Sequence, residues 1–243
     1  MITIDEANFY NGDEKWIKEI GIDNIEESRL NNWAKINDKY YYVKSNYGKY
    51  HEIIGEIIAK SLKLDTAHYE ICKMNDKYFY LSPNFKDKNK IYKRVYELFN
   101  GKNIIDQIDD LELVKQILKM TALDIFMMQV DRTAFNYLFE IDEKIKLAPL
   151  YDYSCCYFAN SNTYELYMNG LFKLPMKSKE LREFKEKYPE LENYLDIIYD
   201  TDYLKLLKNN LKIYDHNLES SNEKYYSEKF NEGRKLINKI YRA

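Results

Sequence analysis

Three segments of the sequence share one pattern: a run of aromatic and β-branched residues, a short polar turn, and a second such run. They are NNWAKI–NDK–YYYVKS (31–45), HYEICKM–NDK–YFYLS (68–82) and NYLFEI–DEK–IKLAPLYD (136–152). β-Branched and aromatic side chains fit a pleated, half-buried surface, and Asn and Asp tolerate tight-turn geometry. Each segment is therefore predicted to form an antiparallel β-hairpin.

The segments between and after these hairpins have helical spacing. Between the first two, Ile53, Ile54, Ile57, Ile58 and Leu62 fall on one helical face, which predicts an amphipathic helix. Residues 111–130 become apolar nearly all round, as expected of a buried helix. Further helices with charged outer faces are predicted near 178–187, 190–199, 203–211 and 221–241.

This order of elements predicts an α+β fold with two lobes. The first lobe, residues 1–83, is a small antiparallel sheet with one helix, and the second, residues 84–243, is mainly helical. The boundary is placed in SPNFKDKNK (82–90), because Pro83 stops the strand and polar residues follow it.

Charge and composition argue against several classes of protein. The chain has 37 Lys and Arg against 40 Asp and Glu, interleaved along its length, which disfavours direct nucleic-acid binding or a membrane-surface role. No apolar run is long enough for a membrane span, and the first residues lack a signal-peptide pattern. Cys72, Cys155 and Cys156 fit neither a disulfide framework nor a metal motif. A reduced cytoplasmic protein with buried thiols is expected.

The third hairpin carries polar residues at both ends. Asn136 immediately precedes its first run and Asp152 immediately follows its second. Antiparallel pairing is expected to bring the two ends together, with paired Cα atoms about 5 Å apart. Asp131 lies in the loop that leads in, so the chain has a D-x-x-x-x-N pattern followed by a second Asp. Asn136 and Asp152 then suit Mg²⁺, and Asp131 can accept a proton from a hydroxyl, as in phosphoryl transfer.

A phosphoryl-transfer site also needs a cation for the nucleotide phosphates. Lys44, at the end of the run YYYVK, is the candidate. Glu52 in the following helix is its predicted partner, and Glu56, one turn further on, is the alternative.

The sequence resembles the HipA-like kinases, a branch of the protein-kinase-like fold. The matching stretches are YYVKSNYGKYHEIIGEIIAKSLKLDTAHYEI, LSPNF, ALDIFMMQVDRTAFNYLFEI and KLAPLYDYS. The resemblance implies ATP and Mg²⁺ as cofactors, Asp131 as catalytic aspartate, and Asn136 and Asp152 as metal ligands. It also implies Lys44 as the phosphate-binding lysine with Glu52 as its partner. The backbone of Tyr80, Leu81 and Ser82 would be the adenine-facing hinge.

Two features depart from the family pattern. Thr133 stands where the family usually has a histidine, and ESRLNN (27–32) stands in place of a glycine-rich phosphate loop. Ser28 lies in that loop and, by the resemblance, is a candidate autophosphorylation site. Asp124 is predicted to be structural, with its carboxylate holding backbone amides of the catalytic loop.

The leading hypothesis is an ATP- and Mg²⁺-dependent kinase that acts on a hydroxyl, most simply Ser or Thr of a protein. One alternative is a catalytically silent kinase-like binding module, such as a toxin–antitoxin component with a cognate antitoxin or regulatory protein as partner. Another is a kinase for a small molecule or lipid headgroup.

Overall fold

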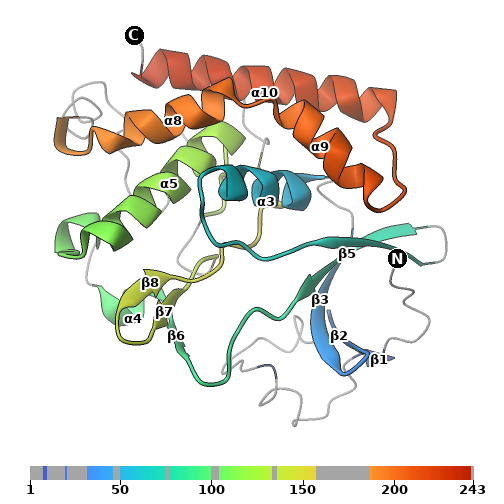
Figure 1. The fold of residues 1–243 in the computed structure, drawn as a ribbon, viewed down its shortest axis with the longest axis horizontal. Helices are drawn as coiled ribbons and strands as arrows, with labels where there is room; N and C mark the ends of the chain where they lie inside the picture. The colour runs from blue at the N-terminus through green and yellow to red at the C-terminus, as the bar shows by residue number, and fades with distance from the viewer. Residues whose placement is uncertain are drawn as a thin grey trace.

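A computed structural model describes residues 8–9, 20, 32–45, 50–74, 77–99, 104–132, 136–156 and 186–241 of the chain. Ser28, Thr133, residues 27–31 and residues 178–185 of a predicted helix lie outside the described residues. The architecture is α+β, as predicted, with helices packed against two antiparallel sheets (Figure 1).

The first sheet has five described strands in the order β1-β2-β3-β5-β4, all antiparallel. The predicted hairpins at 31–45 and 68–82 are confirmed as the pairs β2–β3 and β4–β5. Asn37 and Asp38 form the first turn with φ of 48° and 60°, the left-handed backbone that a two-residue hairpin turn requires. The strands are β1 (Asn8–Phe9), β2 (Trp33–Ile36), β3 (Lys39–Ser45), β4 (Glu70–Met74) and β5 (Lys77–Pro83).

Alternation along β3 gives its two faces different roles. Tyr41 and Val43 are buried in a cluster with Ala34, Ile36, Cys72 and Leu81. Because successive side chains point to opposite faces, Lys44 projects from the other face. Tyr80, which pairs with Lys44 across the ladder, belongs to the main core of the protein. Lys44 therefore lies on the side of the sheet that faces that core.

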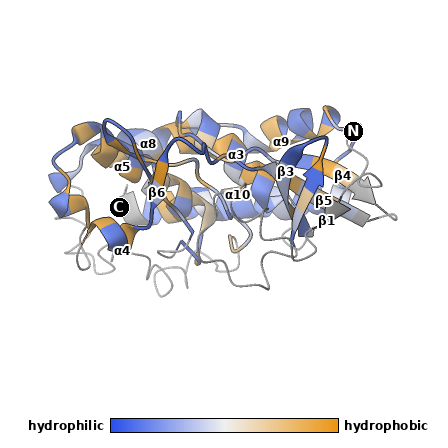
Figure 2. Cartoon of the chain, turned by 90° about the horizontal axis from the view of Figure 1, so that it is seen from below, coloured by the Kyte–Doolittle hydropathy of each residue, from blue (hydrophilic) through white to orange (hydrophobic). Residues whose placement is uncertain are grey.

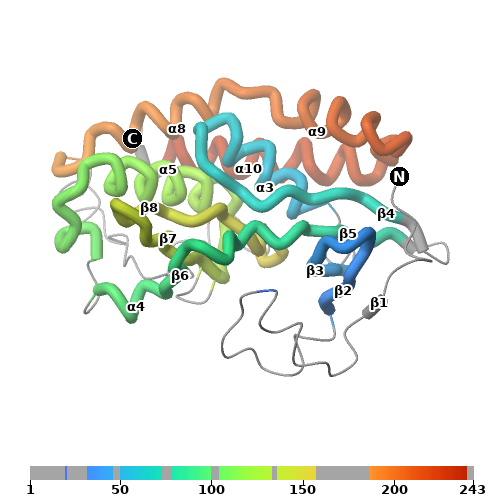
Figure 3. The backbone as a smooth tube through the Cα atoms, turned by 60° about the horizontal axis from the view of Figure 1, so that its bottom comes forward, coloured from blue at the N-terminus to red at the C-terminus, as the bar shows by residue number. Residues whose placement is uncertain are grey.

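The second sheet is small and has the order β6-β7-β8. Its strands are β6 (Ile91–Lys93), β7 (Phe139–Ile141) and β8 (Ile145–Leu147). The third predicted hairpin is therefore present, with residues 142–144 at its turn, but it has only three residues in each strand. In Figure 3 the connection from β5 to β6 crosses the middle of the view and joins the two sheets.

One hydrophobic core joins the helices. The helices are α3 (His51–Ser61), α4 (Val95–Leu98), α5 (Leu111–Met127), α8 (Glu190–Asp200), α9 (Tyr203–Lys212) and α10 (Ser220–Tyr241), with a short 3-10 helix η2 (Ile104–Gln107). Asp110 caps α5 by accepting hydrogen bonds from the amides of Glu112 and Leu113. The second half of α5 is buried all round, as its sequence predicts.

The helix α3 packs into the core that the C-terminal helices form. The strand β5 ends at Pro83, and the domain boundary placed there stays a prediction. However, Ile53, Ile58 and Ala59 of α3 belong to the same core as residues of α5, α8, α9 and α10 (Figure 1). The hydrophobic core is therefore continuous across Pro83. The helix that carries Glu52 is thus held by the C-terminal helices.

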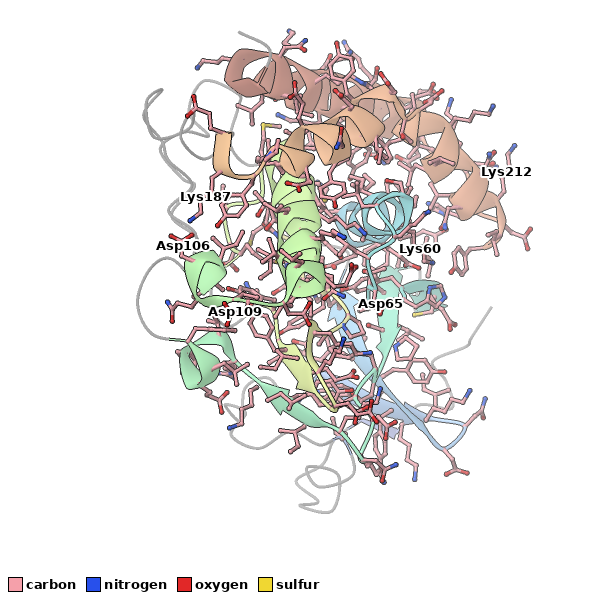
Figure 4. All side chains as sticks on the ribbon, turned by 60° about the vertical axis from the view of Figure 1, so that its left-hand side comes forward. Lys60, Asp65, Asp106, Asp109, Lys187 and Lys212 are labelled. Carbon is pink, nitrogen blue, oxygen red and sulfur yellow. The ribbon has the colours of Figure 1, made fainter. Side chains whose placement is uncertain are left out.

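The C-terminal helices α8, α9 and α10 each carry hydrophobic and hydrophilic residues. Figure 2 shows hydrophobic and hydrophilic residues alternating around α8, α9 and α10, as expected of helices with one face in the core. Among the described residues, no helix combines the length and the apolarity needed to cross a bilayer. At the edge seen in Figure 4, Lys187 lies beside Asp106 of η2, with Nζ 2.5 Å from Oδ1.

Candidate active site

Lys44 forms the centre of a partly buried ionic network. Its Nζ donates to Oε1 of Glu52 at 2.6 Å and to Oδ1 of Asp152 at 2.8 Å. Burial alone would lower the pKa of Lys44, but the two carboxylates outweigh it and raise that pKa above its ordinary value. The ammonium group is therefore charged at neutral pH and joins β3, α3 and the segment after β8.

Of the two glutamates considered as partners of Lys44, Glu52 makes the contact. The Glu52 side chain is only 4% exposed, and its Oε2 accepts the backbone amide of Tyr153 at 3.1 Å. Glu56 instead accepts from Lys60, from His68 and from the backbone amide of Tyr69. Glu56 thus ties α3 to the lead-in of β4 and takes no part in the Lys44 contact.

Asp152 has a strained backbone and well-defined partners. Its φ is 60°, in the left-handed region that few non-glycine residues adopt. The hydroxyl of Tyr69 accepts its amide at 3.2 Å, and Gln129 Nε2 donates to its carbonyl at 3.0 Å. Ser154 Oγ donates to Oδ1 at 2.8 Å. Burial would raise the pKa of Asp152, but Lys44 and Ser154 lower it below its usual value, so the carboxylate is ionised at neutral pH.

Asp131 and Asn136 are in direct contact. Nδ2 of Asn136 donates to Oδ2 of Asp131 at 2.9 Å and to the carbonyl of the same residue. The Gln129 side chain connects this pair to Asp152, because its Oε1 accepts the amide of Asp131 at 3.4 Å while its Nε2 reaches the carbonyl of Asp152. A chain of contacts therefore runs from Glu52 through Lys44, Asp152 and Gln129 to Asp131 and Asn136.

The hairpin does not bring Asn136 and Asp152 together in the way that the sequence suggested. Strand pairing covers Phe139–Ile141 and Ile145–Leu147, and the last backbone bond of the ladder joins Ala148 to Leu138. Asn136 and Asp152 lie beyond this pairing. The prediction that they are directly paired strand ends was wrong, because the strands are too short.

Arg132, which the sequence reasoning missed, lies where the two segments meet. Its Nη1 donates to the carbonyl of Asn136 at 3.0 Å and to that of Tyr151 at 2.8 Å. Its Nε and Nη2 bind the carboxylate of Asp124 at 3.1–3.2 Å. Asp124 is structural, as predicted, and it acts through this guanidinium. Its predicted contacts with backbone amides of the catalytic loop stay a prediction, because residues 133–135 of that loop lie outside the described residues.

Structural similarity identifies the architecture around this network. The structure resembles the Helicobacter pylori proinflammatory kinase CtkA, with a TM-score of 0.52 and 14% identity over 86% of this chain and 91% of that one. It also resembles HipA of Shewanella oneidensis MR-1, solved in a complex with HipB and operator DNA. That match has a TM-score of 0.57 and 13% identity over 86% of this chain and 62% of HipA. The chain has the HipA-like kinase fold. No protein-family model and no curated protein sequence matches it.

In this HipA-like structure the predicted hinge lies earlier than the point where the chain leaves the sheet. Tyr80 and Leu81 lie inside β5, paired with β3 on one side and β4 on the other. Ser82 still pairs with Tyr42 of β3. Backbone groups in a central strand are already engaged in the sheet, so they are poorly placed to bind a base. The connection to β6 begins after Pro83, and Ser82 pairs with β3 alone, so the adenine-facing role of residues 80–82 stays a prediction.

The donor atoms of the network fit one kind of metal ion. Among the described residues, no group of three His, Cys, Asp or Glu side chains has metal-binding geometry. Asp131, Asn136 and Asp152 supply only hard oxygens: two carboxylates and one amide. Such a sparse oxygen set suits Mg²⁺, which keeps several waters and takes its remaining ligands from phosphates. The residues present therefore fit this ion.

The three cysteines do not add a thiolate to the site. Burial raises the pKa of Cys72 to about 12 and raises the pKa values of Cys155 and Cys156 above the ordinary range. The thiols are therefore protonated at neutral pH and unreactive as nucleophiles. All three are free cysteines, as the sequence predicted.

Proposed function

We propose that this protein is an ATP- and Mg²⁺-dependent kinase that transfers the γ-phosphoryl group to a hydroxyl, that of Ser or Thr in a protein. The observation that carries the proposal is the contact of Lys44 with both Glu52 and Asp152, on a fold shared with kinases. Lys44 and Asp152 come from segments 108 residues apart in sequence. Stability alone gives no reason to place a partly buried lysine between two carboxylates, since apolar residues often replace such groups without loss.

Each residue has a role in the proposed reaction. Bound ATP would supply the phosphoryl group, and Mg²⁺ would neutralise the charge of the phosphates. Lys44, oriented by Glu52, binds phosphate oxygens, and the side-chain oxygens of Asn136 and Asp152 hold the cation. Asp131 accepts the proton of the acceptor hydroxyl. The oxygen of that hydroxyl then bonds to the γ-phosphorus, and the bond between this phosphorus and the β–γ bridging oxygen breaks, so that ADP leaves. Asn136 orients Asp131 through the 2.9 Å hydrogen bond between their side chains.

A protein partner is part of the proposal. HipA of Shewanella oneidensis was solved with HipB from a toxin–antitoxin system, which supports a search for a comparable protein partner of this chain.

Thr133 and the lack of a glycine-rich loop at 27–32 favour the second candidate function, a kinase-like module that binds a partner or nucleotide but does not transfer phosphate.

Transfer of radiolabel from γ-labelled ATP tests the proposal. Purified protein is incubated with Mg²⁺ and with generic Ser/Thr substrates, as the wild type, as Asp131→Asn and as Asp142→Asn. Asp142 is exposed at the turn of the third hairpin, so its substitution is a matched control. We expect transfer by the wild type and by Asp142→Asn, and no transfer by Asp131→Asn with nucleotide binding retained. Nucleotide binding without transfer in the wild type would instead support the silent module.

A further inference from the structure

We infer that Arg132 is the positioning residue of the proposed cation site, an inference that rests on the proposed function. The hairpin pairing ends before it reaches Asn136 and Asp152, so the ladder cannot set the distance between these residues. One nitrogen of Arg132 binds both the segment that carries Asn136 and the segment that carries Asp152. Nη1 donates to the carbonyl of Asn136 itself and to that of Tyr151, the neighbour of Asp152.

The guanidinium is held rigidly by its surroundings. The residue is 6% exposed, and Asp124 binds its Nε and Nη2 from the buried end of α5. The central carbon lies 5.3 Å from the centre of the Tyr153 ring. Contacts with a carboxylate, two carbonyls and an aromatic face leave the side chain one orientation. A residue of this kind can transmit the position of α5 to both segments.

The charge of this arrangement also matters for a nearby cation. A lone buried guanidinium would repel Mg²⁺, but the Asp124 carboxylate compensates it. Nη2 of Arg132 lies 3.1 Å from Oδ1 of Asp124, and the two side chains are only 6% and 11% exposed, so they form a buried ion pair. The pair therefore provides hydrogen bonds to the two segments without adding net charge to the site.

A lysine at position 132 cannot make all of these hydrogen bonds. A guanidinium directs five N–H donors in a planar fork, whereas an ammonium group is a single point with three donors. Arg132→Lys keeps the charge but cannot serve Asp124, Asn136 and Tyr151 together. Arg234 offers a matched control, because its guanidinium also donates to two backbone carbonyls, those of Tyr199 and Thr201, at 3.0 and 2.9 Å. Those carbonyls lie at the end of α8, among the C-terminal helices.

Calorimetric titration with a non-hydrolysable ATP analogue, with and without Mg²⁺, tests the inference. The quantity of interest is the gain in affinity that Mg²⁺ produces. Loss of a residue that orients metal ligands typically weakens metal affinity by about 10- to 100-fold. We expect Arg132→Lys to lose about tenfold or more of the Mg²⁺-dependent gain and to keep the affinity measured without Mg²⁺. Arg234→Lys is expected to keep both, although both variants lose stability.

The outcomes separate this inference from the proposed function. An equal Mg²⁺-dependent gain in Arg132→Lys and Arg234→Lys would overturn the positioning role and leave the proposed function standing. No gain in the wild type would overturn the proposed function and, with it, this inference. If Arg132→Lys does not fold, Asp124→Asn takes its place, since its amide offers one acceptor oxygen where the carboxylate uses two, and the guanidinium loses its fixed orientation. A full gain in Asp124→Asn would then overturn the inference.

Discussion

Gly55, in the middle of α3, is predicted to be essential for the packing of Tyr153. A Cβ at this position would lie 2.2 Å from Cγ of Tyr153 and 2.4 and 2.5 Å from its two Cδ atoms. These atoms form the base of the ring, so the ring cannot swing away as the end of a flexible side chain would. Tyr153 is fully buried, and its hydroxyl lies 2.9 Å from Oγ1 of Thr66.

The net effect of Gly55→Ala combines two opposing terms. Replacing a helical glycine by alanine stabilises a helix by about 1 kcal/mol. Overpacking a well-filled core costs about 1–3 kcal/mol, and contacts this short place the cost at the upper end. The free energy of unfolding is therefore expected to fall by about 2 kcal/mol, or roughly 4–8 °C in Tm for a chain of this size.

Urea unfolding of four proteins tests this reasoning: the wild type, Gly55→Ala, Tyr153→Ala and the double variant. Tyr153→Ala removes the ring atoms, so Gly55→Ala is expected to change sign and to stabilise that background by about 1 kcal/mol. If Gly55→Ala stabilises the wild type by the same amount, Tyr153 does not pack on α3 as described. The position assigned to the adjacent Asp152 would then be wrong as well.

Two further predictions concern charge. Lys44→Met leaves the buried Glu52 carboxylate without its cation and should cost about 3–5 kcal/mol at pH 7.5. In the wild type the pKa of Asp152 is lowered, so its contribution is present above its unfolded pKa and is lost as the pH falls through its folded pKa. The cost of Lys44→Met in urea unfolding should therefore shrink on acidification, and a cost independent of pH would contradict the network. The pKa of His68 is raised by its hydrogen bond to Glu56, so this pair stabilises fully below about pH 6.5 and less as the pH rises through the folded pKa of His68. Because the His68 side chain is half exposed, the effect should be at most about 1 kcal/mol. His68→Gln should remove this component between pH 6 and 8.5, and an unchanged pH dependence would count against the pairing.

Local chemistry made the hairpins predictable from sequence. The NDK turn at 37–39 begins with two residues that accept left-handed backbone, and the flanking runs have strand composition. Lys44 could be singled out because it ends a strand and precedes a helix that carries two glutamates. The choice between Glu52 and Glu56 depended on how α3 is rotated against β3, which a sequence pattern does not determine.

Other features depended on tertiary contacts. A single arginine after Asp131 gives no sign that it spans two segments. Its partner Asp124 is seven residues before Asp131, in the part of the helix that becomes apolar nearly all round. Gly55 and Ala59, small residues four apart on one face of α3, gave a weak signal for close packing of this helix, and Gly55 packs on Tyr153.

Thermal unfolding with a non-hydrolysable ATP analogue tests the central claim most directly, namely that Lys44 and Asp152 form a site for a nucleotide with its cation. At about 100 times Kd, a ligand adds roughly 2.7 kcal/mol to the stability of the folded protein. This corresponds to about 5–10 °C in Tm at this chain length. We predict such a shift with Mg²⁺, a smaller one without it, and loss of the Mg²⁺-dependent part in Asp152→Asn. An Mg²⁺-dependent shift that is as large in Asp152→Asn as in the wild type would contradict the account, as would the absence of any shift.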